Sequence, residues 1–182
     1  QMSKETLNLT KALKGDSKMQ GNWGELILER VLEKSGLEKG REYEVQQSFT
    51  TEDGSRVQPD VVINLPDGKK MIVDSKVSLR AYERYVNEED EDSKDSFLKE
   101  HVNSIKRHVE QLGEKNYQDL YQIESPDFVL LFIPMEPAFA IALNEDNTLY
   151  NKAFEKNIVI VTPSTLLATL RTIDSMWTNQ KQ

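Results

Sequence analysis

The stretch QPDVVINLPDGKKMIVDSKV, residues 58–77, predicts two antiparallel strands joined by a turn at Pro66-Asp67-Gly68. Its two apolar segments nevertheless carry three charged residues: Asp60 in the first, and Asp74 and Lys76 in the second. A buried charge costs several kcal/mol unless it is paired or bound to a ligand. These three residues are therefore the first candidates for a functional site.

The spacing around the turn indicates how the three charges are arranged. Asp60 precedes Asp67-Gly68 by about as many residues as Asp74 follows it, so a regular hairpin places the two carboxylates nearly opposite each other. Facing carboxylates repel unless a cation lies between them, and Mg²⁺ prefers hard oxygen ligands of this kind. Lys76 shares a strand face with Asp74 and could orient or acidify a water on that cation. The alternative is a structural Asp74–Lys76 pair on an edge strand, with Asp60 an ordinary residue after Pro59. The paired spacing favours the metal site.

Hydrophobic periodicity around this hairpin predicts an α/β fold. Apolar spacing predicts helices at residues 21–36, over a long region at 79–112, at 137–143 and 149–154, and after Thr162-Pro163. The acidic run 87–95 is expected to interrupt the long region as a solvated loop or helix break. Strands are predicted at 42–50, 57–65, 70–77, 127–134 and 158–163, the last two buried on both faces. This order predicts a three-layer α/β sandwich around a central mixed sheet.

Composition is consistent with one soluble domain. The chain has 182 residues, of which 37% are hydrophobic and 30% charged. We expect a helical arm at 1–19, which could be the end of a coiled coil, a domain at 20–178 and a tail at 179–182. The absence of cysteine excludes disulfides and thiolate metal sites, and no membrane-length apolar run or signal peptide is evident, so we expect a cytoplasmic location. The net charge of −8 argues against a general nucleic-acid coat protein.

Basic side chains after the hairpin could contact phosphate. Arg80 and Arg84 lie one helical turn apart just beyond Lys76, and His108 follows Lys106 and Arg107. Exposed helix arginines are more often only solvated, and a histidine on an apolar helix face is more often a core residue. The same applies to His101.

Two further features lie at strand ends. Glu136, in Pro-Met-Glu-Pro, follows a buried strand, where α/β sheets place functional side chains, but it could equally cap the helix expected from Pro137. The helix start at Thr162-Pro163-Ser164 could hold a phosphate, although a simple cap is the more ordinary interpretation.

The order of helix, strands, PD…DSK and following helix resembles the PD-(D/E)-x-K nuclease superfamily, the restriction-endonuclease-like fold. Five ordered motifs narrow the resemblance to the RmuC family of DNA recombination proteins: QGNWGE (20–25), QPDVVI (58–63), VDSKVSL (73–79), FIPMEPAF (132–139) and VIVTPSTLLATLRT (159–172). The resemblance covers residues 20–178. It implies a Mg²⁺- or Mn²⁺-dependent nuclease acting in DNA rearrangement or repair. Family members typically carry an N-terminal membrane anchor and a long coiled coil.

The resemblance also implies roles for individual residues. Asp60 and Asp74 match the metal-binding acids, Lys76 the catalytic lysine, and the Ser75 backbone carbonyl a further metal ligand. Glu25 matches the acid that the superfamily places on its first helix. The alternative for Glu25 is a capping box, in which its carboxylate would bond to the backbone N–H of Asn22.

Two functions from different classes remain. The first is a metal-dependent DNA nuclease that uses Glu25, Asp60, Asp74 and Lys76 and needs no small-molecule cofactor. The second is a non-catalytic DNA-binding or scaffold domain that keeps the fold without turnover. In both, DNA is the expected partner, and a coiled coil of the parent chain could form a homo-oligomer.

Overall fold

A computed structural model of the chain describes residues 17–46, 49–50, 54, 56–75, 78–115 and 128–181. The expected helical arm therefore lies mostly outside the described residues. The first described element is helix α2 (Ser17–Lys34), which begins earlier than the apolar pattern indicated. No helix in the described ranges is both long and apolar enough to cross a membrane.

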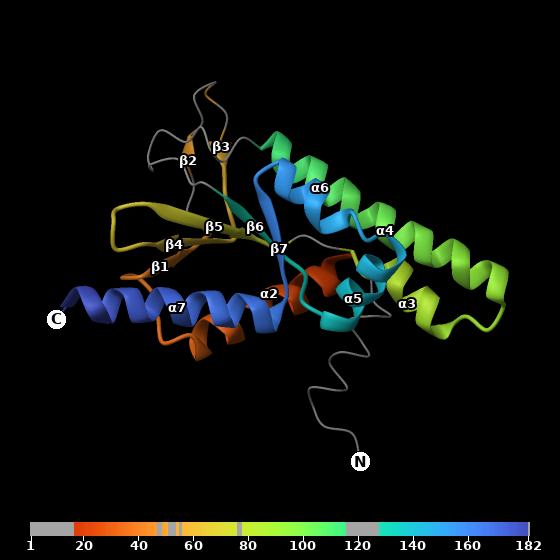
Figure 1. Cartoon of the computed structure of the whole chain (residues 1–182), viewed down its shortest axis with the longest axis horizontal. Helices are drawn as coiled ribbons and strands as arrows, with labels where there is room; N and C mark the ends of the chain where they lie inside the picture. The colour runs from red at the N-terminus through yellow and green to blue at the C-terminus, as the bar shows by residue number, and fades with distance from the viewer. Residues whose placement is uncertain are drawn as a thin grey trace, which may run out of the picture.

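A mixed sheet of five strands forms the centre of the described fold (Figure 1). Its order is β1 (Tyr43–Val45), β4 (Val61–Asn64), β5 (Lys70–Asp74), β6 (Val129–Phe132) and β7 (Ile158–Val161). The first three strands pair antiparallel, whereas β5, β6 and β7 run parallel. The predicted α/β class and mixed sheet are confirmed.

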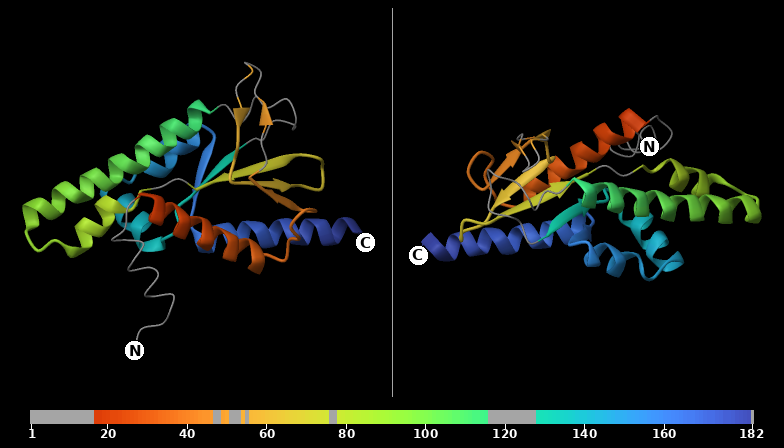
Figure 2. Two further views of the ribbon diagram at one scale, coloured as in Figure 1. Left: turned by 180° about the vertical axis from the view of Figure 1, so that it is seen from behind. Right: turned by 90° about the horizontal axis from the view of Figure 1, so that it is seen from above.

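Helices cover both faces of this sheet, so that it is the middle of three layers (Figures 1 and 2). Helices α2 and α7 (Pro163–Lys181) pack on one face against a cluster that includes Val61, Val73 and Leu130. The other face carries α4 (Glu91–Glu114), α5 (Glu136–Glu145) and α6 (Leu149–Glu155), which pack against the alternate strand residues, including Ile72 and Leu131. Side chains alternate between the faces of a strand, so each hydrophobic run supplies both layers. The last helix continues to Lys181, through most of the residues assigned to a tail.

The strand predicted at 42–50 is wrong, because two separate strands occupy it. Gln46 has a positive φ of 53°, a left-handed conformation that ends β1. Beyond it, β2 (Phe49–Thr50) pairs with β3 (Arg56–Val57) in a small second sheet. The strand predicted at 57–65 is divided in the same way, and its central-sheet part begins only at Val61.

The predicted interruption of the long helical region is confirmed. Helix α3 (Arg80–Asn87) ends at the first residue of the acidic run, and Asp90 caps α4 by accepting a hydrogen bond from the Ser93 backbone N–H at 3.0 Å. The break covers only residues 88–90, because the rest of the run, from Glu91, forms the first turns of α4. Buried His101 bonds through Nε2 to the carbonyl of Ala138 at 2.8 Å. This histidine is a core residue that joins α4 to α5, and burial lowers its pKa.

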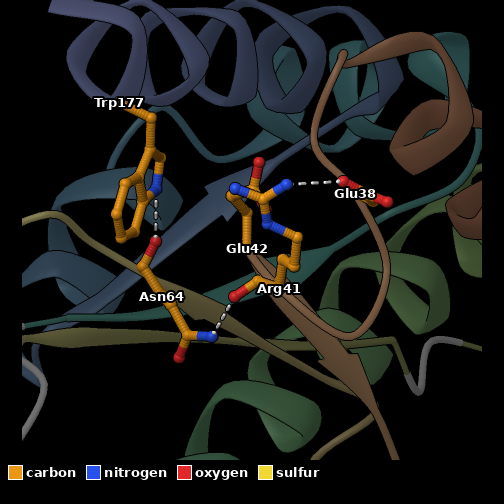
Figure 3. Close-up of polar contacts among 5 residues, drawn as sticks. All are labelled: Glu38, Arg41, Glu42, Asn64 and Trp177. Carbon is orange, nitrogen blue, oxygen red and sulfur yellow. Dashed lines mark hydrogen bonds and ion pairs between the residues drawn. The ribbon is translucent and has the colours of Figure 1, made fainter. Parts of the chain in front are cut away.

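Polar contacts hold the turn end of the hairpin against its neighbours (Figure 3). The Trp177 indole N–H of α7 donates to the backbone carbonyl of Asn64 at 2.9 Å. The Asn64 side chain donates to the carbonyl of Arg41 at 2.8 Å, and Arg41 pairs with exposed Glu38 at 3.3 Å. Glu42 lies beside Arg41, with 3.7 Å between their charged atoms. These contacts attach the α2–β1 connection and α7 to β4.

Candidate active site

The five sequence motifs contain residues that meet at one end of the sheet, where β5, β6 and β7 have their carboxyl ends. The side chain of buried Gln20 in α2 accepts a hydrogen bond from the Leu79 backbone N–H at 3.0 Å. Gly24, one turn further, lies so close to Ser75 and Pro134 that a Cβ there would be 3.5 and 3.6 Å from their side chains. Open α/β sheets bind ligands outside this end of their parallel strands. The segments that carry the candidate residues are thus assembled where the topology favours a site.

Asp60 and Asp74 are both buried at this end of the sheet. Val61 pairs with Val73, so the same register continued by one step sets Asp60 opposite Asp74, as the turn spacing predicts. The two residues lie at strand ends rather than inside strands: Asp60 precedes β4 and Asp74 is the last residue of β5. Both carboxylates accept the backbone N–H of Ser75, Asp60 at 2.7 Å and Asp74 at 3.1 Å. This shared donor brings the two acids together and offsets part of their repulsion.

Away from Ser75, the two acids border different cavities. Asp60 lines a cavity of about 350 Å³ under α2, together with Glu25 and Tyr43. Asp74 lines one of about 290 Å³ on the α4 side, together with His108 and Lys115. Glu25 and Asp60 therefore line one cavity, and Asp74 lines another.

The capping-box interpretation of Glu25 is wrong, because α2 starts at Ser17 and both Asn22 and Glu25 lie inside the helix. Glu25, Glu29 and Glu33 are exposed, and all three line the same cavity. Burial, and after it the charges of Glu33 and Glu29, raise the pKa of Tyr43. Four carboxylates line this cavity against one lysine, Lys39, so the cavity suits a cation better than an anion.

Lys115 is a residue that the sequence reasoning missed. Its Nζ lies 3.1 Å from Asp74 Oδ2, and its side chain is 30% exposed against 3% for that of Asp74. Lysine at the end of a helix is ordinarily explained by the helix dipole. The sequence offered no sign of this contact, which joins residues 41 positions apart.

His108 connects the Asp74 cavity to a third one. Its Nε2 accepts the Ser78 backbone N–H at 3.3 Å, which assigns the ring proton of the neutral form to Nδ1. Burial lowers the His108 pKa, and the charge of Arg107 lowers it further. The third cavity, of about 470 Å³ between α3 and α4, is lined by His108 together with Arg80, Arg84 and Arg107. Four of the five candidate phosphate-binding residues therefore lie around one cavity.

Two candidates are placed elsewhere. Lys106 forms an ion pair with Asp146 at 2.9 Å and does not line the cavity of the arginines. Glu136 does not cap its own helix: it is the first residue of α5 and accepts hydrogen bonds from the hydroxyls of Thr162 and Ser164, each at 2.7 Å. These bonds, led by that from Ser164, lower the pKa of Glu136. The start of α7 was one candidate site for a phosphate, but the Glu136 carboxylate of the protein itself lies there.

The carboxylates of Asp60 and Asp74 are the type of ligand that a hard divalent cation prefers. Asp60 and Asp74 converge on one backbone N–H, and Mg²⁺ commonly takes one or two carboxylates and completes its shell with water. The described residues contain no cluster of three or more acidic, histidine or cysteine ligands. Lys76 lies outside the described residues.

Comparison with known proteins identifies the family. The sequence model of the RmuC family matches residues 1–182. The chain is 54% identical over 181 residues to the DNA recombination protein RmuC homolog of Pseudomonas aeruginosa, 52% over 182 to that of Vibrio cholerae, and 50% over 182 to DNA recombination protein RmuC of Escherichia coli K12. All of this chain is covered, but it spans only 40%, 36% and 38% of these relatives. The chain belongs to the RmuC family.

Proposed function

We propose that this domain is a Mg²⁺- or Mn²⁺-dependent nuclease of restriction-endonuclease-like fold that hydrolyses phosphodiester bonds of DNA during recombination or repair. The observation that carries the proposal is the pair of buried carboxylates, Asp60 and Asp74, held on the backbone N–H of Ser75 at the carboxyl end of the sheet. Relatives named DNA recombination proteins support the biological setting.

In this proposal Asp60 and Asp74 hold the cation, with the Ser75 carbonyl as a further ligand and Glu25 contributing from the Asp60 side. A bound divalent cation would supply Lewis-acid stabilisation of the charge that develops on the phosphate oxygens. Lys76 orients the attacking water. The neighbouring cavity between α3 and α4 offers positive charge to the substrate backbone.

The test is cleavage of labelled linear and circular DNA by the purified domain with Mg²⁺, Mn²⁺ or EDTA. We expect cleavage that requires the metal and is lost in Asp60→Asn and Asp74→Asn. Loss of cleavage in both variants, with melting temperatures measured in EDTA to check folding, supports the assignment. Metal-independent cleavage, or full activity of Asp74→Asn, would contradict it. Comparing linear with circular substrates also separates end-dependent from internal cleavage.

A second candidate is a DNA-binding domain without turnover, and the Lys115–Asp74 ion pair favours it. That pair engages one oxygen of the carboxylate that a metal would need. Tight DNA binding by the domain, with no cleavage under any metal and no effect of Mn²⁺ on melting temperature, would select this alternative.

A further inference from the structure

We propose that the cavity between α3 and α4 is a phosphate-binding site for the nucleic-acid backbone, with Arg80, Arg84 and Arg107 as its anion ligands. This site extends the proposed function by assigning the surface that holds the DNA beside the carboxylates. The choice of DNA as the ligand rests on that proposed function. Its volume of about 470 Å³ is within the range of pockets that hold small ligands.

The three arginines are spaced so that they face one cavity. Arg80 and Arg84 lie one turn apart on α3, and Arg107 comes from the facing side of α4. They line one cavity together with the polar side chains of Ser78, Ser104 and Gln111. Guanidinium groups supply paired donors that match phosphate oxygens, and hydroxyl and amide groups can complete such a site.

The three arginines also lack carboxylate partners among the described residues. No ion pair engages Arg80, Arg84 or Arg107 within the described ranges, although Glu100 also lines the cavity and the chain carries a net charge of −8. Arg84 instead lies over the ring of Phe97, 6.0 Å from its centre. Three guanidinium groups gathered without carboxylate partners repel one another, and a bound polyanion would remove that cost.

The arginine cavity adjoins the cavity that contains Asp74. His108 lines both the arginine cavity and the one that contains Asp74. A backbone phosphate among the arginines would therefore lie next to the carboxylates, with His108 between them. Contacts of this kind position a nucleic acid without reading its bases, so we expect little sequence preference.

The experiment measures binding of a fluorescein-labelled 25-mer, single- and double-stranded, in EDTA and at several salt concentrations. The test variant is Arg80→Ala/Arg84→Ala/Arg107→Ala. Its control is Lys99→Ala/Lys106→Ala/Lys152→Ala, which removes the same charge, from −8 to −11, at positions that do not line the cavity. We expect the test variant to lose roughly tenfold or more in affinity and about 1 to 2 units of the slope of log K against log salt, and the control to lose little.

Equal losses in the two variants would overturn the proposal, because they would show an effect of net charge alone. Competition by polyglutamate as effective as that by unlabelled DNA would also overturn it, since the ligand would then be an acidic protein. If the triple variant has a lowered melting temperature, single variants replace it. Arg107→Gln, at an exposed position, is then the test variant, and Lys106→Gln is its control. Binding in EDTA does not depend on catalysis, so a domain that does not cleave DNA can still confirm the phosphate site. Conversely, loss of binding would not by itself exclude a metal site.

Discussion

Removal of Lys115 should lower the stability of the domain without metal and tighten its binding of a divalent cation. The Lys115–Asp74 contact joins a nearly buried carboxylate to a partly exposed ammonium group at 3.1 Å. An exposed pair contributes about 0.2–1 kcal/mol, whereas breaking a fully buried one costs about 3–5 kcal/mol. We therefore expect Lys115→Met to cost about 2 kcal/mol in EDTA, or roughly 4–8 °C of melting temperature for a chain of this size.

A double-mutant cycle isolates the contact. Lys115→Met, Asp74→Asn and the double variant are compared with wild type by urea unfolding in EDTA, and the contact should appear as a coupling energy of about 1–2 kcal/mol. Additivity of the single effects within about 0.5 kcal/mol would show that the contact contributes nothing.

The same substitution should also change metal binding. A cation at Asp60 and Asp74 competes with the Lys115 ammonium for one carboxylate, so Lys115→Met should bind Mn²⁺ more tightly than wild type. A ligand present at about a hundred times its Kd stabilises the folded state by about 2.7 kcal/mol. The Mn²⁺-dependent rise in melting temperature should therefore saturate at lower metal concentration in Lys115→Met and disappear in Asp74→Asn. A wild-type domain without any rise at millimolar Mn²⁺ would refute the metal site, and weaker Mn²⁺ binding by Lys115→Met would refute the competition.

Four further predictions concern other positions. Glu25→Gln should weaken Mn²⁺ binding in a melting titration while leaving metal-free stability equal or slightly higher, because the crowded acidic cavity loses one charge; unchanged affinity and cleavage would remove Glu25 from the site. Lys76→Ala should keep the metal-induced stabilisation and lose cleavage, and an unfolded variant would instead indicate a structural ion pair. His101 has a lowered pKa, so it contributes stability that is complete above about pH 6.5 and is lost as the pH falls; His101→Gln should therefore show a smaller loss of unfolding free energy between pH 7 and 5 than wild type, and equal losses would count against this role. Gly36→Ala should cost about 1–2 kcal/mol in urea unfolding, because φ is +90° and a Cβ would lie 2.7 Å from Asp174 Oδ2; a silent change would mean that the turn relaxes freely.

Local sequence patterns predicted much of the fold because they depend on neighbouring residues. The turn at Pro66-Asp67-Gly68 predicted the register that sets Asp60 opposite Asp74, since strand pairing on both sides of a tight turn has little freedom. Apolar periodicity predicted the helices and the buried strands β6 and β7 in the same way. Where the backbone departs from regular geometry, as at Gln46, the periodicity gave no warning, and one predicted strand became parts of two sheets.

The pattern also supplied candidate residues for the site, but it did not predict the contacts between distant segments. The contact of Lys115 with Asp74, and the attachment of Glu136 to the start of α7, join segments far apart in the chain. Lys106 and Arg107 are adjacent in sequence, yet one pairs with Asp146 and the other lines the arginine cavity, because successive residues of a helix point about 100° apart. Such contacts depend on how whole helices pack across the two faces of the sheet. Packing is a property of distant surfaces that no local window of the sequence contains.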